Sequence, residues 1–177
     1  MMRDAALDEV TGGSLRRATV STKAILPVHS LVVWAALVFY EEIRHRPPPL
    51  LRALVPQALR SEGDKRCIGG VVRCSYRRGH LLKVITDVGE GRVVAFDVRE
   101  QNLHILGGVR LLGGSTVIEP LRPWSTRVTL TTRYALPDRR PAWLRSWLAA
   151  RVAHAFHRHL LEGMRLECSV RAELQSH

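Results

Sequence analysis

The chain has 177 residues, of which 46% are hydrophobic and 24% charged, a composition that suits one folded domain and excludes wholesale disorder. Its 27 Lys and Arg exceed its 16 Asp and Glu by 11 and are spread along the chain, which predicts a basic surface open to an anionic membrane but no compact nucleic-acid-binding run. Three cysteines without a C-x-x-C pair argue against a disulfide framework or a structural zinc site and indicate a reducing compartment.

Two segments bear on location. The first 14 residues carry early acidic residues and no apolar core, so no signal peptide is predicted. The apolar run Leu31–Tyr40 would span about 15 Å as a helix, half of the roughly 30 Å hydrocarbon core of a membrane. We therefore expect a cytoplasmic protein with a flexible leader over residues 1–15, one domain over 16–170 and a flexible tail over 171–177.

The first third of the chain predicts one strand and two helices. Alternation of apolar and polar residues over Thr19–Leu26 is typical of a strand. Helical spacing of apolar residues then predicts a helix over Ser30–Arg44, which the prolines at 47–49 forbid from continuing. A short second helix is predicted over Leu50–Leu59.

A meander of antiparallel strands follows, separated by turn residues at hairpin spacing. The predicted strands are Lys65–Tyr76, His80–Val88, Arg92–Val98, Val109–Glu119 and Ser125–Ala135. Glycines at 79, 89 and 91 suit tight hairpin turns, because glycine adopts a positive φ without strain. Residues 99–108 are predicted to be a looser connection, residues 120–124 a turn, and Gly113-Gly114 a bulge that bends its strand.

A long helix is predicted from Pro137 to Cys168. Its predicted apolar stripe consists of Leu144, Leu148, Val152, Ala155, Phe156, Leu160 and Met164. The fold class is therefore α+β: six or seven antiparallel strands in a curved sheet around one long C-terminal helix, with two short helices after the first strand. Such a sheet leaves a space beneath the helix that side chains fill or a ligand occupies.

Four segments in this order resemble a known superfamily. They are Pro27 with Val33-Trp34; Arg73-Cys74-Ser75-Tyr76 with Gly79 and Val84-Ile85-Thr86; Val94-Ala95-Phe96-Asp97-Val98; and Thr131-Thr132-Arg133-Tyr134 with Trp143, Trp147 and His154-Ala155-Phe156-His157. In their spacing the chain resembles the SRPBCC superfamily, the START and Bet v 1-like helix-grip group that includes polyketide cyclase/dehydratase-like and coenzyme Q-binding proteins. The resemblance covers about residues 18–168. Arg133 and Lys83 depart from it, because an aromatic and an acidic residue are expected at those positions.

The resemblance implies a cavity that binds a small hydrophobic molecule such as a lipid, a polyketide or a quinone-like compound. The residues predicted to bind it are Trp34, Leu82, Val84, Phe96, Leu130, Thr132, Tyr134, Trp147, His154 and His157. The alternative is a cyclase/dehydratase-type enzyme in which Tyr134 polarises a carbonyl while His154 or His157 moves a proton. A second alternative is a basic accessory protein that docks on an anionic membrane or on nucleic acid.

Other reactive side chains have weaker support. His154, His157 and His159 could supply two metal ligands, but the sequence offers no third, so no metal site is predicted. Asp87 and Asp97 lie on neighbouring predicted strands, where a carboxylate pair competes with pairing between Asp97 and an arginine. Cys74 is expected to be a small buried hydrophobic residue.

No residue is assigned a catalytic role and no cofactor is predicted. The chain lacks G-x-G-x-x-G, the Walker loop, G-x-S-x-G and H-E-x-x-H, which removes the usual support for nucleotide-dependent and serine-hydrolase chemistry. The sequence does not indicate an oligomeric state.

Overall fold

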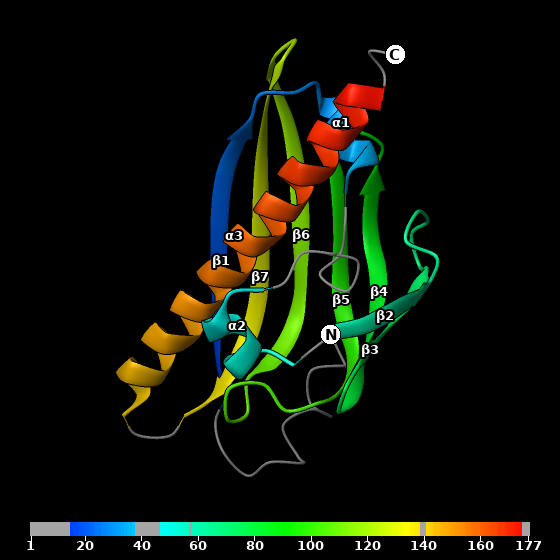
Figure 1. The fold of residues 1–177 in the computed structure, drawn as a ribbon. Coiled ribbons are helices and arrows are strands. Elements are labelled where there is room, and N and C mark those ends of the chain that lie inside the picture. Colours follow the sequence, from blue (N-terminus) through cyan, green and yellow to red (C-terminus); the bar gives the residue numbers. More distant parts are fainter. Residues whose placement is uncertain (1–14, 38–46, 57, 139–140, 175–177) are drawn as a thin grey trace.

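One curved antiparallel sheet with a long helix lying across it dominates the computed structural model (Figure 1), which describes residues 15–37, 47–56, 58–138 and 141–174. The strands are β1 (Leu15–Leu26), β2 (Ala58–Gly63), β3 (Val71–Tyr76), β4 (Gly79–Gly89), β5 (Val93–Asn102), β6 (Arg110–Arg122) and β7 (Ser125–Pro137). The helices are α1 (Ser30–Ala35), α2 (Pro49–Leu54) and α3 (Ala142–Leu174). Across the sheet the order is β1-β7-β6-β5-β4-β3-β2, so β1 and β2 form its two edges. The predicted α+β helix-grip architecture is confirmed.

The edge strand β1 is longer than its alternating pattern predicts. It begins at Leu15, opposite Pro137, and stays in register with β7 until Leu26 lies opposite Thr126. Pairing with β7 along its whole length supplies the hydrogen bonds that extend β1 four residues before Thr19.

The first helix is shorter than predicted. α1 ends at Ala35, where the N–H of Ala36 donates to the Val32 carbonyl and the N–H of Leu37 donates to the Trp34 carbonyl. The rest of the helix predicted to reach Arg44 falls at residues 38–44, outside the described residues.

The prediction of a helix over Leu50–Leu59 is wrong beyond Leu54. Val55 has an extended backbone with ψ near 131°, the conformation that a following proline favours, and Pro56 follows it. The chain then enters edge strand β2, whose residue Ser61 pairs with Cys74 of β3. The strand predicted over 65–76 begins only at Val71, because residues 64–70 form a loop.

The hairpins of the meander follow the sequence pattern more closely. Gly79 and Gly91 occupy the predicted turns with φ of 127° and 69°. β5 continues to Asn102, into the segment predicted to be loose, and its residue Gln101 holds the next loop in place. The Gln101 side chain accepts from the N–H of Leu111 at 2.8 Å and donates to the Val109 carbonyl at 2.9 Å.

The predicted bulge at Gly113-Gly114 is confirmed, since the β6–β7 register shifts between Leu111 and Gly113. β6 continues through Arg122, so the turn predicted over 120–124 is confined to Pro123 and Trp124. β7 likewise extends past Ala135 to Pro137, and the following helix starts later than predicted for that reason.

Helix α3 covers one face of the sheet and runs six residues beyond the predicted end at Cys168. Its residues Val152 and Met164 are buried, as the apolar stripe predicts, but Leu144 and Leu148 are exposed. The helix therefore leaves the sheet at its N-terminal end. Among the described residues, no helix combines the length and apolar character needed to cross a bilayer.

Candidate functional site

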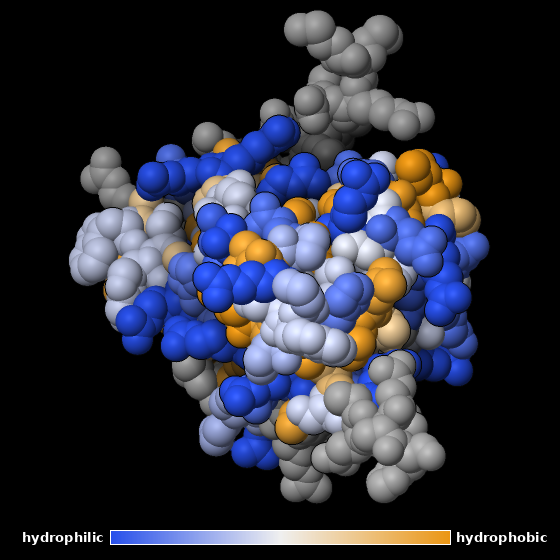
Figure 2. All heavy atoms as spheres, turned by 90° about the horizontal axis from the view of Figure 1, so that it is seen from above, coloured by the Kyte–Doolittle hydropathy of each residue, from blue (hydrophilic) through white to orange (hydrophobic). Residues whose placement is uncertain are grey.

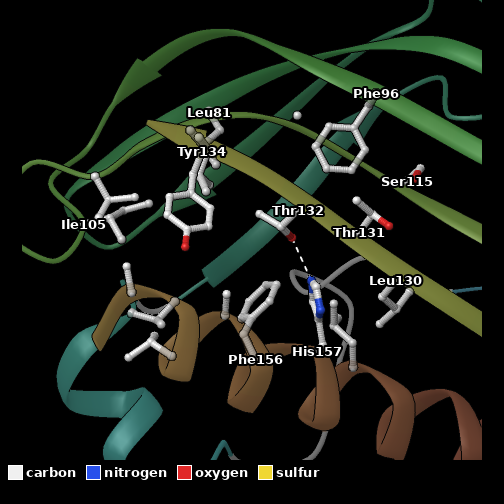
Figure 3. A pocket seen from close by; sticks show the side chains of 18 of the residues that line it. Leu81, Phe96, Ile105, Ser115, Leu130, Thr131, Thr132, Tyr134, Phe156 and His157 are labelled. Carbon is white, nitrogen blue, oxygen red and sulfur yellow. Dashed lines mark hydrogen bonds between the residues drawn. The ribbon is translucent and has the colours of Figure 1, made fainter. Parts of the chain in front are cut away.

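A cavity of about 140 Å³ lies between α3 and the sheet (Figure 3). Helix α3 supplies Ala149, Val152, Ala153, Phe156, His157, Leu160 and Met164. The sheet supplies Tyr76, Leu81, Lys83, Phe96, Leu111, Gly113, Ser115, Thr116, Leu130, Thr131, Thr132 and Tyr134. Val55 and the loop residues Ile105, Leu106 and Val109 complete the lining. Most of these side chains are apolar, as in cavities that hold small organic molecules.

Half of the predicted binding residues line this cavity. They are Phe96, Leu130, Thr132, Tyr134 and His157. They come from β5, β7 and α3, which the sequence places far apart and the curved sheet brings together. On β7 the predicted alternation of inward and outward residues is correct for Leu130, Thr132 and Tyr134.

The other five predicted residues lie elsewhere. Leu82 and Val84 are on the opposite face of β4 from the buried residues Leu81, Lys83 and Ile85, because neighbouring residues of a strand point to opposite faces.

The two tryptophans and His154 also fall outside the lining. Trp34 packs against the core cluster that contains Val33 and Met164. Trp147 is 55% exposed near the start of α3. His154 is half-buried and is linked to the cavity residue His157 by two hydrogen bonds that meet at the Thr22 hydroxyl.

Tyr134 is the phenol of the cavity. Its side chain is buried, and its hydroxyl points across the cavity towards α3 (Figure 3). Burial raises the pKa of this phenol above its usual value of 10.0, so it is a neutral hydrogen-bonding group near pH 7. Within the described part of the chain no side chain or carbonyl bonds to this hydroxyl.

His157 lies in a chain of hydrogen bonds that leads out of the cavity. Its Nε2 lies 2.8 Å from the Thr132 hydroxyl and its Nδ1 lies 2.9 Å from the Thr22 hydroxyl. The same Thr22 oxygen lies 2.8 Å from Nδ1 of His154. Burial, with a smaller contribution from His154, lowers the pKa of His157 from 6.5 to about 4, so its imidazole is neutral at pH 7.

This neutral imidazole permits two arrangements of protons. If Nδ1 of His157 donates to Thr22, then Nε2 accepts from Thr132, and the Thr22 hydroxyl is left to donate to His154. In the reverse tautomer Nε2 donates to Thr132, which frees the threonine hydroxyl to donate into the cavity. The network can therefore present either an acceptor or a donor to a bound molecule.

Lys83 is a cavity residue that sequence analysis noted only as a departure from the superfamily. Its side chain is 6% exposed, and its Nζ lies 5.1 Å from the centre of the Phe96 ring. A cation over an aromatic face is electrostatically stabilised. The sequence signal that would have identified Lys83 is the apolar pair Leu81 and Ile85, which lies on the same face of β4. If this face is taken as the inward one, Lys83 points into the cavity.

The remaining candidates do not form a reactive cluster. Asp97 pairs with Arg133 at 2.6 Å, and both side chains are about half exposed. Asp87 is opposite Ala95 in the β4–β5 register, so the two aspartates do not face each other. Cys74 is fully buried, as predicted, and His159 is buried away from the cavity lining.

In the segments 15–37, 47–56, 58–138 and 141–174, no three His, Cys, Asp or Glu side chains are grouped so that they could hold a metal ion.

Solved structures share this fold. The Zhui aromatase/cyclase from Streptomyces sp. R1128 has 14% identity and a TM-score of 0.61, over 89% of this chain and 96% of that one. The protein TTHA0849 from Thermus thermophilus has 17% identity and a TM-score of 0.61, over 87% of this chain and 99% of that one. A START superfamily protein from Mycobacterium smegmatis has 13% identity and a TM-score of 0.57, over 85% and 97% of the two chains.

These likenesses establish an SRPBCC/START-like helix-grip fold. No family model matches the sequence. No curated protein matches it either. At such identities the shared fold does not carry a ligand or a reaction with it.

Proposed function

We propose that this protein binds a small hydrophobic molecule, such as a lipid, a polyketide or a quinone-like compound, in the cavity between α3 and the sheet. The observation that carries this proposal is an apolar cavity into which the Tyr134 hydroxyl points without a protein partner among the described residues. A buried phenol normally forms a hydrogen bond, and a carbonyl or hydroxyl of the bound molecule would supply it. The START and aromatase/cyclase neighbours support such a role through their fold.

Native mass spectrometry of the purified protein tests this proposal, with organic extraction of any excess mass. We expect a discrete excess mass that leaves on denaturation. The variant Ala153→Phe places a ring in the cavity and should lose that mass, whereas Ser169→Phe, on an exposed part of the same helix, should retain it. Equal retention by both variants would show that the molecule binds elsewhere.

A second candidate function is that of a cyclase/dehydratase-type enzyme. It is favoured by the hydrogen-bonded chain Thr132–His157–Thr22–His154, which joins the cavity to a half-buried histidine. Such a chain can carry a proton to or from a reacting group. Incubating the extracted molecule with the protein separates the two functions. If the protein is an enzyme, the wild type converts the extracted molecule, and His157→Gln binds this molecule without converting it. If the protein is a carrier, the wild type leaves the molecule unchanged.

The proposed partner outside the cavity is an anionic membrane surface. Four large side chains are exposed on the first turns of α3, with exposed fractions of 71% for Trp143, 43% for Leu144, 55% for Trp147 and 39% for Leu148. The Arg151 guanidinium lies 5.3 Å from the centre of the Trp147 ring. Tryptophan and arginine side by side on a helix face suit the headgroup region of an anionic bilayer, and the net charge of +11 attracts the protein to it.

This tryptophan face adjoins the end of the ligand cavity. A second hollow beside it is lined by Arg145 and Leu148 and shares Leu106, Val109 and Ala149 with the main cavity. Figure 2 views the opposite end of the molecule, where hydrophilic side chains dominate and hydrophobic ones form only small groups. Docking through the first turns of α3 would therefore bring the cavity towards the lipid that supplies its ligand.

A further inference from the structure

The cavity between α3 and the sheet is small for a ligand site. Its volume is about 140 Å³. Sites for drug-sized molecules occupy roughly 300–1,000 Å³, whereas a cavity of about 150 Å³ lined by apolar side chains holds one benzene molecule. Leu106, Val109 and Ala149 line both this cavity and the second hollow, so they stand between the two. The enclosed space therefore matches a single six-membered ring with a short substituent.

Aromatic side chains from three elements surround this space. Phe96 comes from β5, Tyr134 from β7 and Phe156 from α3, and Figure 3 shows their rings on different sides of the cavity. Aromatic rings attract one another in offset or edge-to-face arrangements, because the face of each ring is electron-rich and its edge is electron-poor. A flat aromatic ring bound among these three side chains gains contacts that an aliphatic chain of the same volume does not make.

Tyr134 adds an unpaired hydrogen-bond donor to this apolar space. Its hydroxyl points across the cavity towards α3, and no described residue bonds to it. The Thr132 hydroxyl, by contrast, is already hydrogen-bonded to Nε2 of His157 at 2.8 Å. Burial raises the pKa of the Tyr134 phenol, which therefore keeps its proton near pH 7 and can donate it in a hydrogen bond. The site favours a ligand with one hydrogen-bond acceptor.

A carbonyl group suits this donor better than a hydroxyl group. A carbonyl oxygen only accepts, whereas a hydroxyl group brings a proton of its own that needs a second partner in an apolar space. A carbonyl attached to an aromatic ring is conjugated with it and lies in the plane of the ring. The ligand then remains flat, with the oxygen projecting from one edge towards Tyr134.

We propose that the natural ligand is a one-ring aromatic compound with a carbonyl group on the ring, and that this carbonyl accepts a hydrogen bond from Tyr134. The inference rests on the proposed function, since it takes the cavity as the binding site, and it specifies the size and chemistry of the bound molecule. The aromatic ring of the ligand packs against Phe96 and Phe156.

The hydrogen bond sets the expected preference for a carbonyl. A hydrogen bond between neutral groups adds only modestly to affinity, because both partners give up bonds to water. An apolar ligand of the same shape leaves the buried phenol without a partner, which adds to the difference. The carbonyl compound should therefore bind about fivefold more tightly than its apolar isostere.

The test is an NMR titration of the full chain, freed of bound molecules, with acetophenone and α-methylstyrene, in which a methylene group replaces the carbonyl oxygen. The wild type is expected to bind acetophenone about fivefold more tightly. Tyr134→Phe removes only the phenol oxygen and should bind both probes with similar affinity. Because no described residue bonds to that oxygen, the variant should remain folded, which circular dichroism checks.

A third probe, 2-acetylnaphthalene, tests the size of the site. It carries the same carbonyl group on two fused rings. If the cavity had room for both rings, the larger apolar surface would make this probe bind more tightly than acetophenone. We expect it to bind about tenfold more weakly, because the second ring must displace packed side chains.

The outcomes separate this inference from the proposed function. Equal affinity of the wild type for acetophenone and α-methylstyrene would overturn the carbonyl, and tighter binding of 2-acetylnaphthalene would overturn the one-ring size. A preference that persists in folded Tyr134→Phe would place the carbonyl away from Tyr134. If neither one-ring probe binds but the purified protein holds an excess mass that Ala153→Phe loses, the inference fails and the proposed function stands. If that mass is absent as well, both fail.

Discussion

The buried imidazole of His157 should make the stability of this protein fall in mild acid. Burial lowers the pKa of His157 from 6.5 to about 4 in the folded state, whereas the unfolded chain regains the ordinary value. The unfolded state therefore binds more protons between these two values. The contribution of His157 is complete above pH 6.5 and is lost progressively as the pH falls towards 4.

The expected loss follows from this difference in pKa. A shift from 6.5 to about 4 corresponds to roughly 3 kcal/mol when fully expressed, and to about 2 kcal/mol between pH 7 and pH 5. The variant His157→Gln removes the titrating group but keeps a donor and an acceptor for Thr132 and Thr22. Its own stability should therefore depend less on pH over this range.

Urea unfolding of wild type and His157→Gln at pH 7, 6 and 5 measures this effect. The free energy of unfolding of the wild type, minus that of the variant, should decrease by about 2 kcal/mol from pH 7 to pH 5. Taking the difference cancels the other titrating groups that the two proteins share. His154→Gln serves as a control, because it retains the buried imidazole and should retain most of the pH dependence. Parallel pH profiles for wild type and His157→Gln would refute a lowered pKa at His157.

Two further predictions concern the surface and the backbone. Replacing Trp143 and Trp147 together by serine should weaken co-sedimentation with phosphatidylglycerol vesicles at low salt. The control Trp124→Ser, which replaces an equally exposed tryptophan at the far end of the molecule, should not weaken it. Equal effects of the two changes would exclude the first turns of α3 as the membrane-docking face. Gly79→Ala should lower the free energy of unfolding by about 2 kcal/mol or more, because φ is 127° and a Cβ would meet the Asn102 carbonyl. Thermal unfolding checks the second prediction, and an unchanged midpoint would contradict it.

Local sequence was sufficient where an element's pattern is set by its own residues. The alternation that runs through Thr129, Leu130 and Thr131 predicted β7 with its correct inward face, since a half-buried strand has one apolar side. The turn glycines at 79 and 91 were identified because tight hairpins need a positive φ. The same logic located the bulge at Gly113.

Local sequence failed where partners elsewhere in the sheet decide the structure. Residues 58–63 contain no clear alternation, and they form β2 because the edge of β3 offers them hydrogen bonds. β1 likewise extends back to Leu15 because β7 runs beside it. The exposure of Leu144 on α3 also depends on where the helix leaves the sheet, which periodicity does not reveal.

The error at β4 connects the difficulty of prediction with the function. Both faces of this strand carry apolar residues, Leu81 and Ile85 on one and Leu82 and Val84 on the other. Only the charge of Lys83 distinguishes the two faces in the sequence. Because a lysine on a half-buried strand ordinarily faces water, its presence favours the frame that the structure shows to be wrong. Contacts made in three dimensions, among them the Phe96 ring 5.1 Å from the Lys83 Nζ, decide which face of β4 turns inward, and a local pattern does not contain them.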